Sequence, residues 1–196
     1  MNCSSKGVAD LPSYHHTEVI TTPMVFTSVC TIIAIVWGFD NPNTALQSLN
    51  EPHPLLWIST HFSHSNINHL VKNIMALWLL NYLFPIKLPT FITASMFCVP
   101  MVGCYAIWQD IQYFLGLSAL LYIFPGYYYH RLIKLKTYLP AFFILFFLVS
   151  YFLLSYLIFS NNELLTPLTE QKPFIAAHAI GFISGIFAYY FETNHK

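Results

Sequence analysis

Residues 174–191 read FIAAHAIGFISGIFAYYF, 18 residues without a charged side chain. A helix needs about 20 mostly apolar residues to cross the hydrocarbon core of a bilayer. The run contains a single histidine, His178, followed at i+3 and i+7 by Gly181 and Gly185. These three residues share one helical face, and two glycines spaced four apart let a neighbouring backbone approach closely. The run therefore predicts a membrane helix that packs tightly along the face carrying an imidazole.

The composition of the whole chain agrees with a membrane location. Of 196 residues, 56% are hydrophobic and only 8% are charged, whereas soluble domains carry about 25% charged residues. This leaves too little polar surface to cover a globule in water, which excludes soluble enzymes. The 8 basic residues balance the 8 acidic ones, so the charge gives no basis for a nucleic-acid partner.

Five further apolar runs precede residues 174–191, separated by polar or proline-bearing breaks. They cover residues 23–39, 67–84, 90–108, 111–129 and 138–159. We therefore expect an all-α, polytopic membrane protein with six membrane helices. The expected organisation is an N-terminal tail over residues 1–22, a membrane domain over residues 23–191 and a short C-terminal tail over residues 192–196.

The basic residues predict the orientation of these helices. With both termini in the cytoplasm, the loops and tails on that side hold Lys6, Lys87, Arg131, Lys134, Lys136 and Lys196. The outer side holds Lys172, and Lys72 falls within a predicted helix. This arrangement satisfies the positive-inside rule. The second, fourth and sixth helices then all enter the membrane from the outer face.

Polar side chains recur at one depth in these three helices. His69 and Asn73 fall in the first two turns of the second helix, Ser118 in the second turn of the fourth and His178 in the second turn of the sixth. Because polar groups are costly in lipid, they are expected to face the bundle interior, where they indicate a functional site. Contact between the fourth and sixth helices along Gly116, Gly181 and Gly185 would bring Ser118 to His178.

A serine beside a neutral imidazole is the minimum machinery for acyl transfer, because the imidazole accepts the hydroxyl proton. The tetrahedral intermediate also needs donors for its oxyanion, and the Asn73 amide and the His69 ring are the candidates. No intramembrane carboxylate is present to orient His178. The chemistry therefore indicates a Ser/His dyad with no cofactor.

The chain resembles the rhomboid family of intramembrane serine proteases from the first predicted helix to the last. The second helix has H-x-x-x-N as H69-L-V-K-N73, the fourth has G116-L-S-A119 where the family has G-x-S-G, and the sixth has H178-A-I-G-F-I-S-G185. The resemblance implies a six-helix rhomboid-like bundle. It also implies that Ser118 is the nucleophile, that His178 is the base and that Asn73 and His69 bind the oxyanion.

Two supporting roles also follow from the resemblance. Tyr122 would pack against the catalytic imidazole, and His64 would be a structural histidine below the long first loop. The substrate would be a single-pass or tail-anchored membrane protein, cleaved in or near its membrane segment within the lipid bilayer. The implied location is the bacterial inner membrane.

The chain departs from the family pattern at two positions. Ala119 stands where glycine is usual, and Trp57 is followed by Ile58 instead of the family's arginine. The compact chain and the stretch from Thr60 through His64 to His69 look most like the rhombosortase branch. That branch implies removal of C-terminal Gly-Gly anchoring tails from exported proteins.

Three alternatives remain open at the level of sequence. The first is a catalytically inactive rhomboid-like protein that binds and escorts membrane helices. The second is a metal site built from His61, His64, His69 and His178, although the chain lacks H-E-x-x-H and an intramembrane carboxylate. The third is a small transporter, which would need ionisable residues along a path to both faces. We predict the protease, with no metal.

Overall fold

The computed structural model describes residues 16–39, 54–109, 115–146, 149–150 and 175–194, and every regular element within them is helical. This confirms the all-α prediction for the described part of the chain. The helices are α1 (His16–Trp37), α2 (Pro54–Thr60), α3 (Ile67–Leu83), α4 (Leu88–Trp108), α5 (Ser118–Leu121), α6 (Ile123–Lys134) and α8 (Ile175–Asn194). A further helical segment covers residues 138–146.

Among the described residues, three helical stretches are long and apolar enough to cross a membrane. They are Ile20–Trp37, Leu88–Trp108 and Ile175–Asn194. With 17 residues, α3 would span about 26 Å at 1.5 Å per residue, slightly less than a hydrocarbon core of about 30 Å. The rest of the predicted fifth run, residues 147–148 and 151–159, lies outside the described residues, as do the tail residues 1–15 and 195–196.

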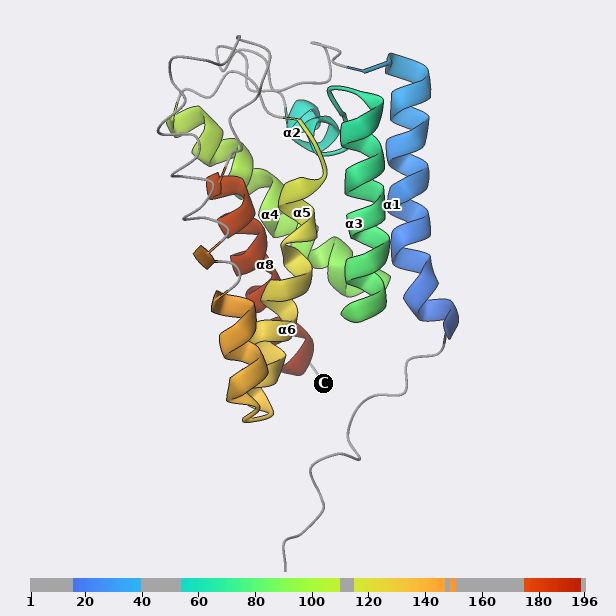
Figure 1. Ribbon diagram of the computed structural model, residues 1–196. Helices are drawn as coiled ribbons and strands as arrows, with labels where there is room; N and C mark the ends of the chain where they lie inside the picture. The colour runs from blue at the N-terminus through green and yellow to red at the C-terminus, as the bar shows by residue number, and fades with distance from the viewer. Residues whose placement is uncertain (1–15, 40–53, 110–114, 147–148, 151–174, 195–196) are drawn as a thin grey trace, which may run out of the picture.

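The helices form a bundle in which α8 lies beside α4, α5 and α6 (Figure 1). It packs most extensively against α6 and α4, while α1 packs against α3 at the edge of the bundle. α1 begins at His16 rather than at the predicted Pro23, and Pro23 lies inside the helix. Next to this proline, the Thr22 hydroxyl donates to the carbonyl of Ile86, 3.0 Å away, and fastens α1 to the chain after α3.

The fourth predicted helix is the main correction. The sequence predicts a helix over residues 111–129 with Ser118 in its second turn, but residues 115–117 are not helical and Ser118 is the first residue of α5. The backbone at Gly116 has φ +117°, which side-chain-bearing residues rarely adopt. A helix cannot continue through that conformation, so helical structure starts only after it. Residues 111–114 lie outside the described part.

The backbones of α5, α6 and α8 meet at glycines. A Cβ added at Gly181 would collide with the carbonyl oxygen of Ala119, and one at Gly185 would collide with the carbonyl oxygen of Ile123. From the opposite side, a Cβ at Gly126 would collide with the carbonyl oxygen of Phe182. These positions therefore require glycine, because the colliding atoms belong to the backbone and cannot rotate away.

We predict that Gly185→Val lowers the thermal stability of the protein. Overpacking typically costs about 1–3 kcal/mol, which corresponds to a fall in Tm of roughly 5 °C for a chain of this size. The measurement is thermal unfolding of the purified protein in detergent. Phe187→Val on the same helix is the control, because Phe187 is 49% exposed. Equal Tm values for Gly185→Val and Phe187→Val would contradict the tight contact.

Candidate active site

Ser118 and His178 meet across two helices although they are 60 positions apart in the chain. Ser118 Oγ lies 3.1 Å from His178 Nε2, within hydrogen-bond distance. His178 is 5% exposed, and Ser118 is half-buried at the start of α5. With Nε2 unprotonated, the serine hydroxyl donates to the imidazole, which is the arrangement required for proton transfer from the hydroxyl.

The ring of Tyr122 holds the imidazole from one side. The two rings stack with centroids 4.5 Å apart and planes inclined by 16°. Tyr122 stands between α5 and α6, one helical turn after Ser118. The same turn of chain therefore presents the hydroxyl and restricts the plane of the imidazole ring.

Two polar side chains of α3 face the backbone just before Ser118. A Cβ added at Gly116 would lie 2.9 Å from His69 Nε2 and 3.3 Å from Asn73 Nδ2. Asn73 is 7% exposed, and its Nδ2 has no hydrogen-bond partner among the described residues. A buried amide donor without a partner is costly unless something else accepts from it. Its position beside Gly116 lets it donate to a group bound next to Ser118.

The start of α3 fixes the His69 ring. Asn66 caps the helix by accepting from the His69 backbone N–H at 2.9 Å. The hydroxyl of Ser65 lies 3.2 Å from His69 Nδ1 and accepts from Asn66 Nδ2 at 3.3 Å. Because Ser65 Oγ already accepts from Asn66, its own hydrogen can point to His69 Nδ1. When that hydrogen bond forms, the ring proton of His69 resides on Nε2, an atom that faces Gly116.

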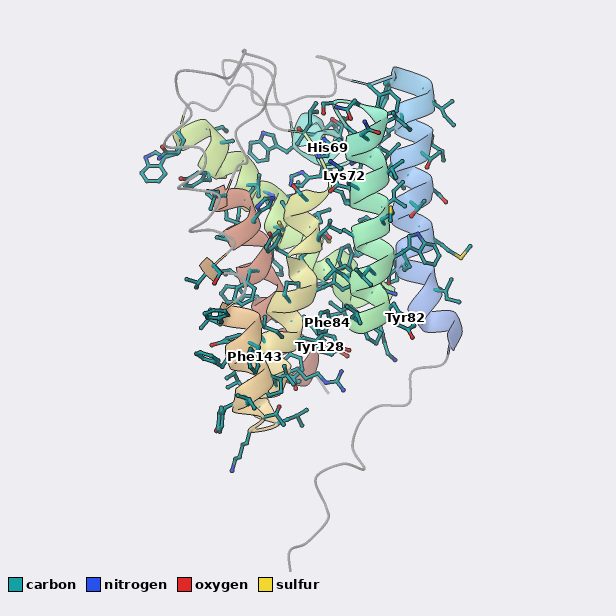
Figure 2. The ribbon with its side chains drawn as sticks, viewed as in Figure 1. His69, Lys72, Tyr82, Phe84, Tyr128 and Phe143 are labelled. Carbon is teal, nitrogen blue, oxygen red and sulfur yellow. The ribbon has the colours of Figure 1, made fainter. Side chains whose placement is uncertain are left out.

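Sequence reasoning did not assign roles to Ser65 and Asn66. The signal for Asn66 was present, since asparagine is a preferred N-cap residue and stands directly before the predicted helix start at Ile67. No comparable pattern marks Ser65, whose contact with His69 depends on the local turn. Figure 2 shows His69 near one end of the bundle, with Lys72 one turn further along α3.

The chain that follows α2 closes this end of the site. The N–H of Gly116 donates to the carbonyl of Thr60 at 2.9 Å, so this segment fixes the backbone before Ser118. The His61 Nδ1–H donates to the carbonyl of Trp57 at 2.7 Å. α2 itself packs against α4. The sequence predicts an undivided loop over residues 40–66, and α2 is a correction to that prediction for its described part.

His64 lies between this segment and α3. Its Nδ1–H donates to the carbonyl of Phe62 at 3.1 Å, and its ring meets the His69 ring edge to face at 5.1 Å. It is 2% exposed. Burial lowers the pKa of His64 to about 4, and burial likewise lowers the pKa of His61 to about 4. Both imidazoles are therefore neutral at physiological pH and serve as packed, hydrogen-bonded groups.

The structure thus brings the site residues predicted from sequence into one region. Gly116 adjoins His69 and Asn73, Gly181 touches the backbone after Ser118, and His64 lies behind His69. Gly185 lies one turn further along α8, against Ile123. Among the described residues, no three His, Cys, Asp or Glu side chains are grouped closely enough to hold a metal ion. The arrangement offers a hydroxyl, a base and adjacent hydrogen-bond donors.

Comparison with protein families identifies the family of this chain. A family model described as Rhomboid domain matches residues 52–194, which includes α2 and every helix that follows it. No match to the chain was found among curated proteins or among solved structures.

We predict that acidification destabilises the fold through His61 and His64. Their ordinary pKa of 6.5 falls to about 4 in the folded protein, so between these values the unfolded chain binds more protons. The stability that these two neutral imidazoles contribute is therefore fully present above pH 6.5 and is lost as the pH falls toward 4. The measurement is Tm at a series of pH values. His61→Gln and His64→Gln should each show a shallower decline, and a decline as steep as that of the wild type would refute the assignment.

Proposed function

Because this chain belongs to the rhomboid family of intramembrane serine proteases, we propose that it is an integral-membrane serine endopeptidase with a Ser118/His178 dyad. The contact of 3.1 Å between Ser118 Oγ and His178 Nε2 carries this proposal. Families of this kind also contain inactive members, so the dyad geometry supports activity beyond what membership alone implies. Rhomboids act on membrane proteins within the bilayer, and we assign the same class of substrate to this protein.

In the proposed reaction, Ser118 Oγ attacks the scissile carbonyl carbon while His178 Nε2 takes the hydroxyl proton. The carbonyl oxygen becomes an oxyanion, which accepts hydrogen bonds from Asn73 Nδ2 and His69 Nε2. As the peptide bond breaks, His178 returns its proton to the leaving amine. A water molecule, deprotonated by the same imidazole, then hydrolyses the acyl-enzyme and regenerates Ser118.

Three structural features support these roles. The Asn73 amide is buried and has no hydrogen-bond partner among the described residues, as expected of a donor kept for an oxyanion. The contacts of His69 with Ser65 and Asn66 favour a proton on Nε2. Stacking against Tyr122 limits the motion of the His178 ring, which replaces part of the orienting role that a carboxylate has in triads.

The substrate must unwind before it can be cut. A transmembrane helix satisfies its backbone carbonyls internally, so the scissile bond becomes accessible only where the helix opens. Glycine near the cut lowers the cost of opening by about 1 kcal/mol per residue relative to alanine. The backbone two residues before Ser118 is bonded to the last residue of α2, and α2 lies at one end of the bundle (Figure 1), so cleavage is expected near that membrane face.

We include in this proposal the rhombosortase role, the removal of C-terminal Gly-Gly anchoring tails. It is supported by the stretch from Thr60 through His64 to His69, which resembles that branch and whose members line the site. The first substrate to test is therefore a reporter with a C-terminal Gly-Gly tail followed by an apolar helix. We also propose that the protein lies in the bacterial inner membrane with both termini in the cytoplasm. The orientation rests on the basic residues at the end of the bundle opposite α2.

We predict that a fluorophosphonate probe labels the wild-type protein at Ser118. Labelling requires a serine whose proton passes to a base, so Ser118→Ala should abolish it and His178→Ala should reduce it to background. Ser184→Ala is the control, because the Ser184 hydroxyl donates to the Ile180 carbonyl at 2.9 Å within α8. Folded wild-type protein that fails to react would instead favour an inactive protein that escorts membrane helices.

We predict that Asn73→Ala reduces the rate of reporter cleavage by about 100-fold or more, the typical effect of removing one oxyanion donor. The loss should appear in kcat, because the oxyanion forms only during the reaction. Asn81→Ala on the same helix is the control, since Asn81 is also buried but is not among the residues that adjoin Gly116. An unchanged kcat in folded Asn73→Ala would remove Asn73 from the mechanism.

A further inference from the structure

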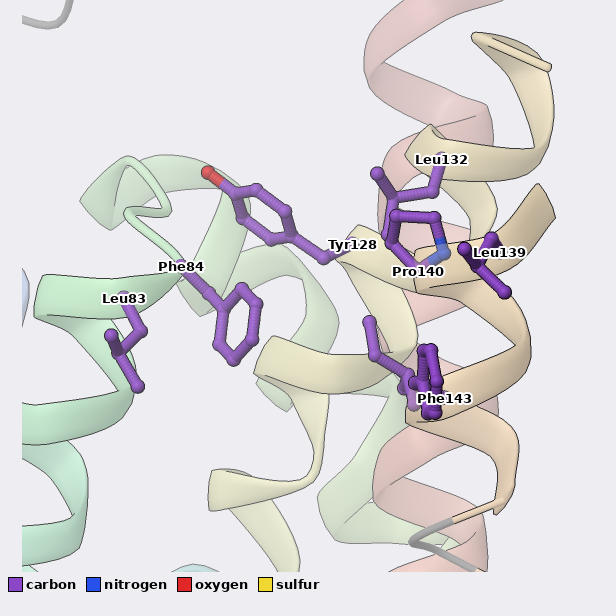
Figure 3. A pocket seen from close by; sticks show the side chains of 8 residues that line it. Leu83, Phe84, Tyr128, Leu132, Leu139, Pro140 and Phe143 are labelled. Carbon is purple, nitrogen blue, oxygen red and sulfur yellow. The ribbon is translucent and has the colours of Figure 1, made fainter. Parts of the chain in front are cut away.

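A cleft of about 470 Å³ is lined by Phe84, Tyr128 and Phe143 among others, and Figure 2 shows these three side chains toward the end of the bundle away from α2. Its volume falls in the range of about 300–1,000 Å³ that is typical of small-molecule sites. Its lining is almost wholly apolar. Figure 3 shows its walls, which include Leu83 and Phe84 at the end of α3, Tyr128 and Leu132 on α6, and Leu139 and Phe143 on the helical segment 138–146.

A buried cation lies beside this cleft. Arg131 is 8% exposed, and in the described part of the chain its guanidinium contacts only Tyr128. Its Nη1 donates to the Tyr128 hydroxyl at 3.2 Å, and the guanidinium carbon lies 5.2 Å from the centre of the Tyr128 ring. A guanidinium has five donors. No nitrogen of Arg131 is among the buried polar atoms that lack a partner in the described part of the chain, so its remaining donors reach the surface beside Tyr128, where an anion can accept from them.

The surrounding charges also favour an anion. Lys134, the last residue of α6, and Lys136, in the turn that follows, are exposed, and they lie in sequence between the lining residues Leu132 and Leu139. The Tyr128 hydroxyl also donates to the Pro85 carbonyl at 3.1 Å, which brings the chain next to Lys87 toward the same end. The Glu192 carboxylate accepts hydrogen bonds from the Tyr127 hydroxyl at 2.7 Å and from the Thr90 hydroxyl at 3.2 Å.

An apolar cleft with basic residues next to its lining residues matches a molecule that has an apolar chain and an anionic head. We propose that the cleft binds one anionic phospholipid, with an acyl chain between Phe84 and Phe143 and its phosphate against Arg131, Lys134 and Lys136. Basic clusters of this kind at the cytoplasmic end of membrane helices attract anionic lipids. This site is separate from the Ser118/His178 region, and it does not depend on whether the protein cleaves peptides.

The test is native mass spectrometry of the purified full-length protein, delipidated in detergent and then supplied with phosphatidylglycerol or phosphatidylcholine. We expect one phosphatidylglycerol to be retained in preference to phosphatidylcholine. Each basic side chain contributes about fivefold in affinity at a membrane surface. Arg131→Gln should therefore weaken retention at least about fivefold, and Arg131→Lys should restore part of it.

A second variant tests the apolar part without disturbing Arg131. Leu139 is 67% exposed, so Leu139→Trp should fill the cleft without unfolding the protein and should reduce retention of phosphatidylglycerol. Met96→Trp on α4 is the matched control, because Met96 is 72% exposed and is not part of the cleft. If Arg131→Gln does not fold, the Lys134→Gln/Lys136→Gln double variant is used in its place to test the contribution of the basic residues to lipid retention.

Three results would overturn the proposal. Equal retention of the two lipids would exclude recognition of the charge. Retention unchanged by Leu139→Trp would place the lipid elsewhere. Displacement of phosphatidylglycerol by inorganic phosphate at the same concentration would show that the acyl chain contributes nothing, and the cleft would then not be a lipid site.

Discussion

The backbones of α5 and α6 approach that of α8 so closely at Gly126, Gly181 and Gly185 that a single methyl group would collide with a carbonyl oxygen. Within a bilayer, helix association cannot draw on the hydrophobic effect and depends on such close packing. Gly181 lies three residues after His178 on the same face, and it meets the backbone of the residue that follows Ser118. The distance between the Ser118 and His178 side chains is therefore fixed by backbone contact, which is stiffer than contact between side chains.

Much of this arrangement could be predicted from the sequence because it follows from helical periodicity. The spacing of His178, Gly181 and Gly185 defines one face of α8, and the spacing of His69 and Asn73 defines one face of α3. Apolar run lengths also give the limits of α4 and α8 to within a few residues. These properties are local, since each depends only on residues within one helix.

The parts that could not be predicted are those where the chain leaves regular structure. Gly116 was expected inside a helix, because the run from residue 111 to residue 129 is apolar overall although Gly116, Ser118 and Pro125 interrupt it. Its positive φ is imposed by partners far away in sequence, namely the Thr60 carbonyl on one side and the His69 and Asn73 side chains on the other. For the same reason α2 was missed, since a helix of 7 residues carries little periodic signal and is stabilised by packing against α4.

The departure at Ala119 can be judged from this packing. A family pattern of Gly-x-Ser-Gly suggests that a methyl group after the serine would separate the helices and inactivate the site. In the structure Ala119 is fully buried, and its carbonyl oxygen meets Gly181 of α8, so the close approach there is provided by the glycine of the opposite helix. Ser118 Oγ still lies 3.1 Å from His178 Nε2. Since one glycine at a crossing is enough for two backbones to meet, the extra methyl group is compatible with an intact dyad, and the substitution gives little reason to prefer an inactive protein.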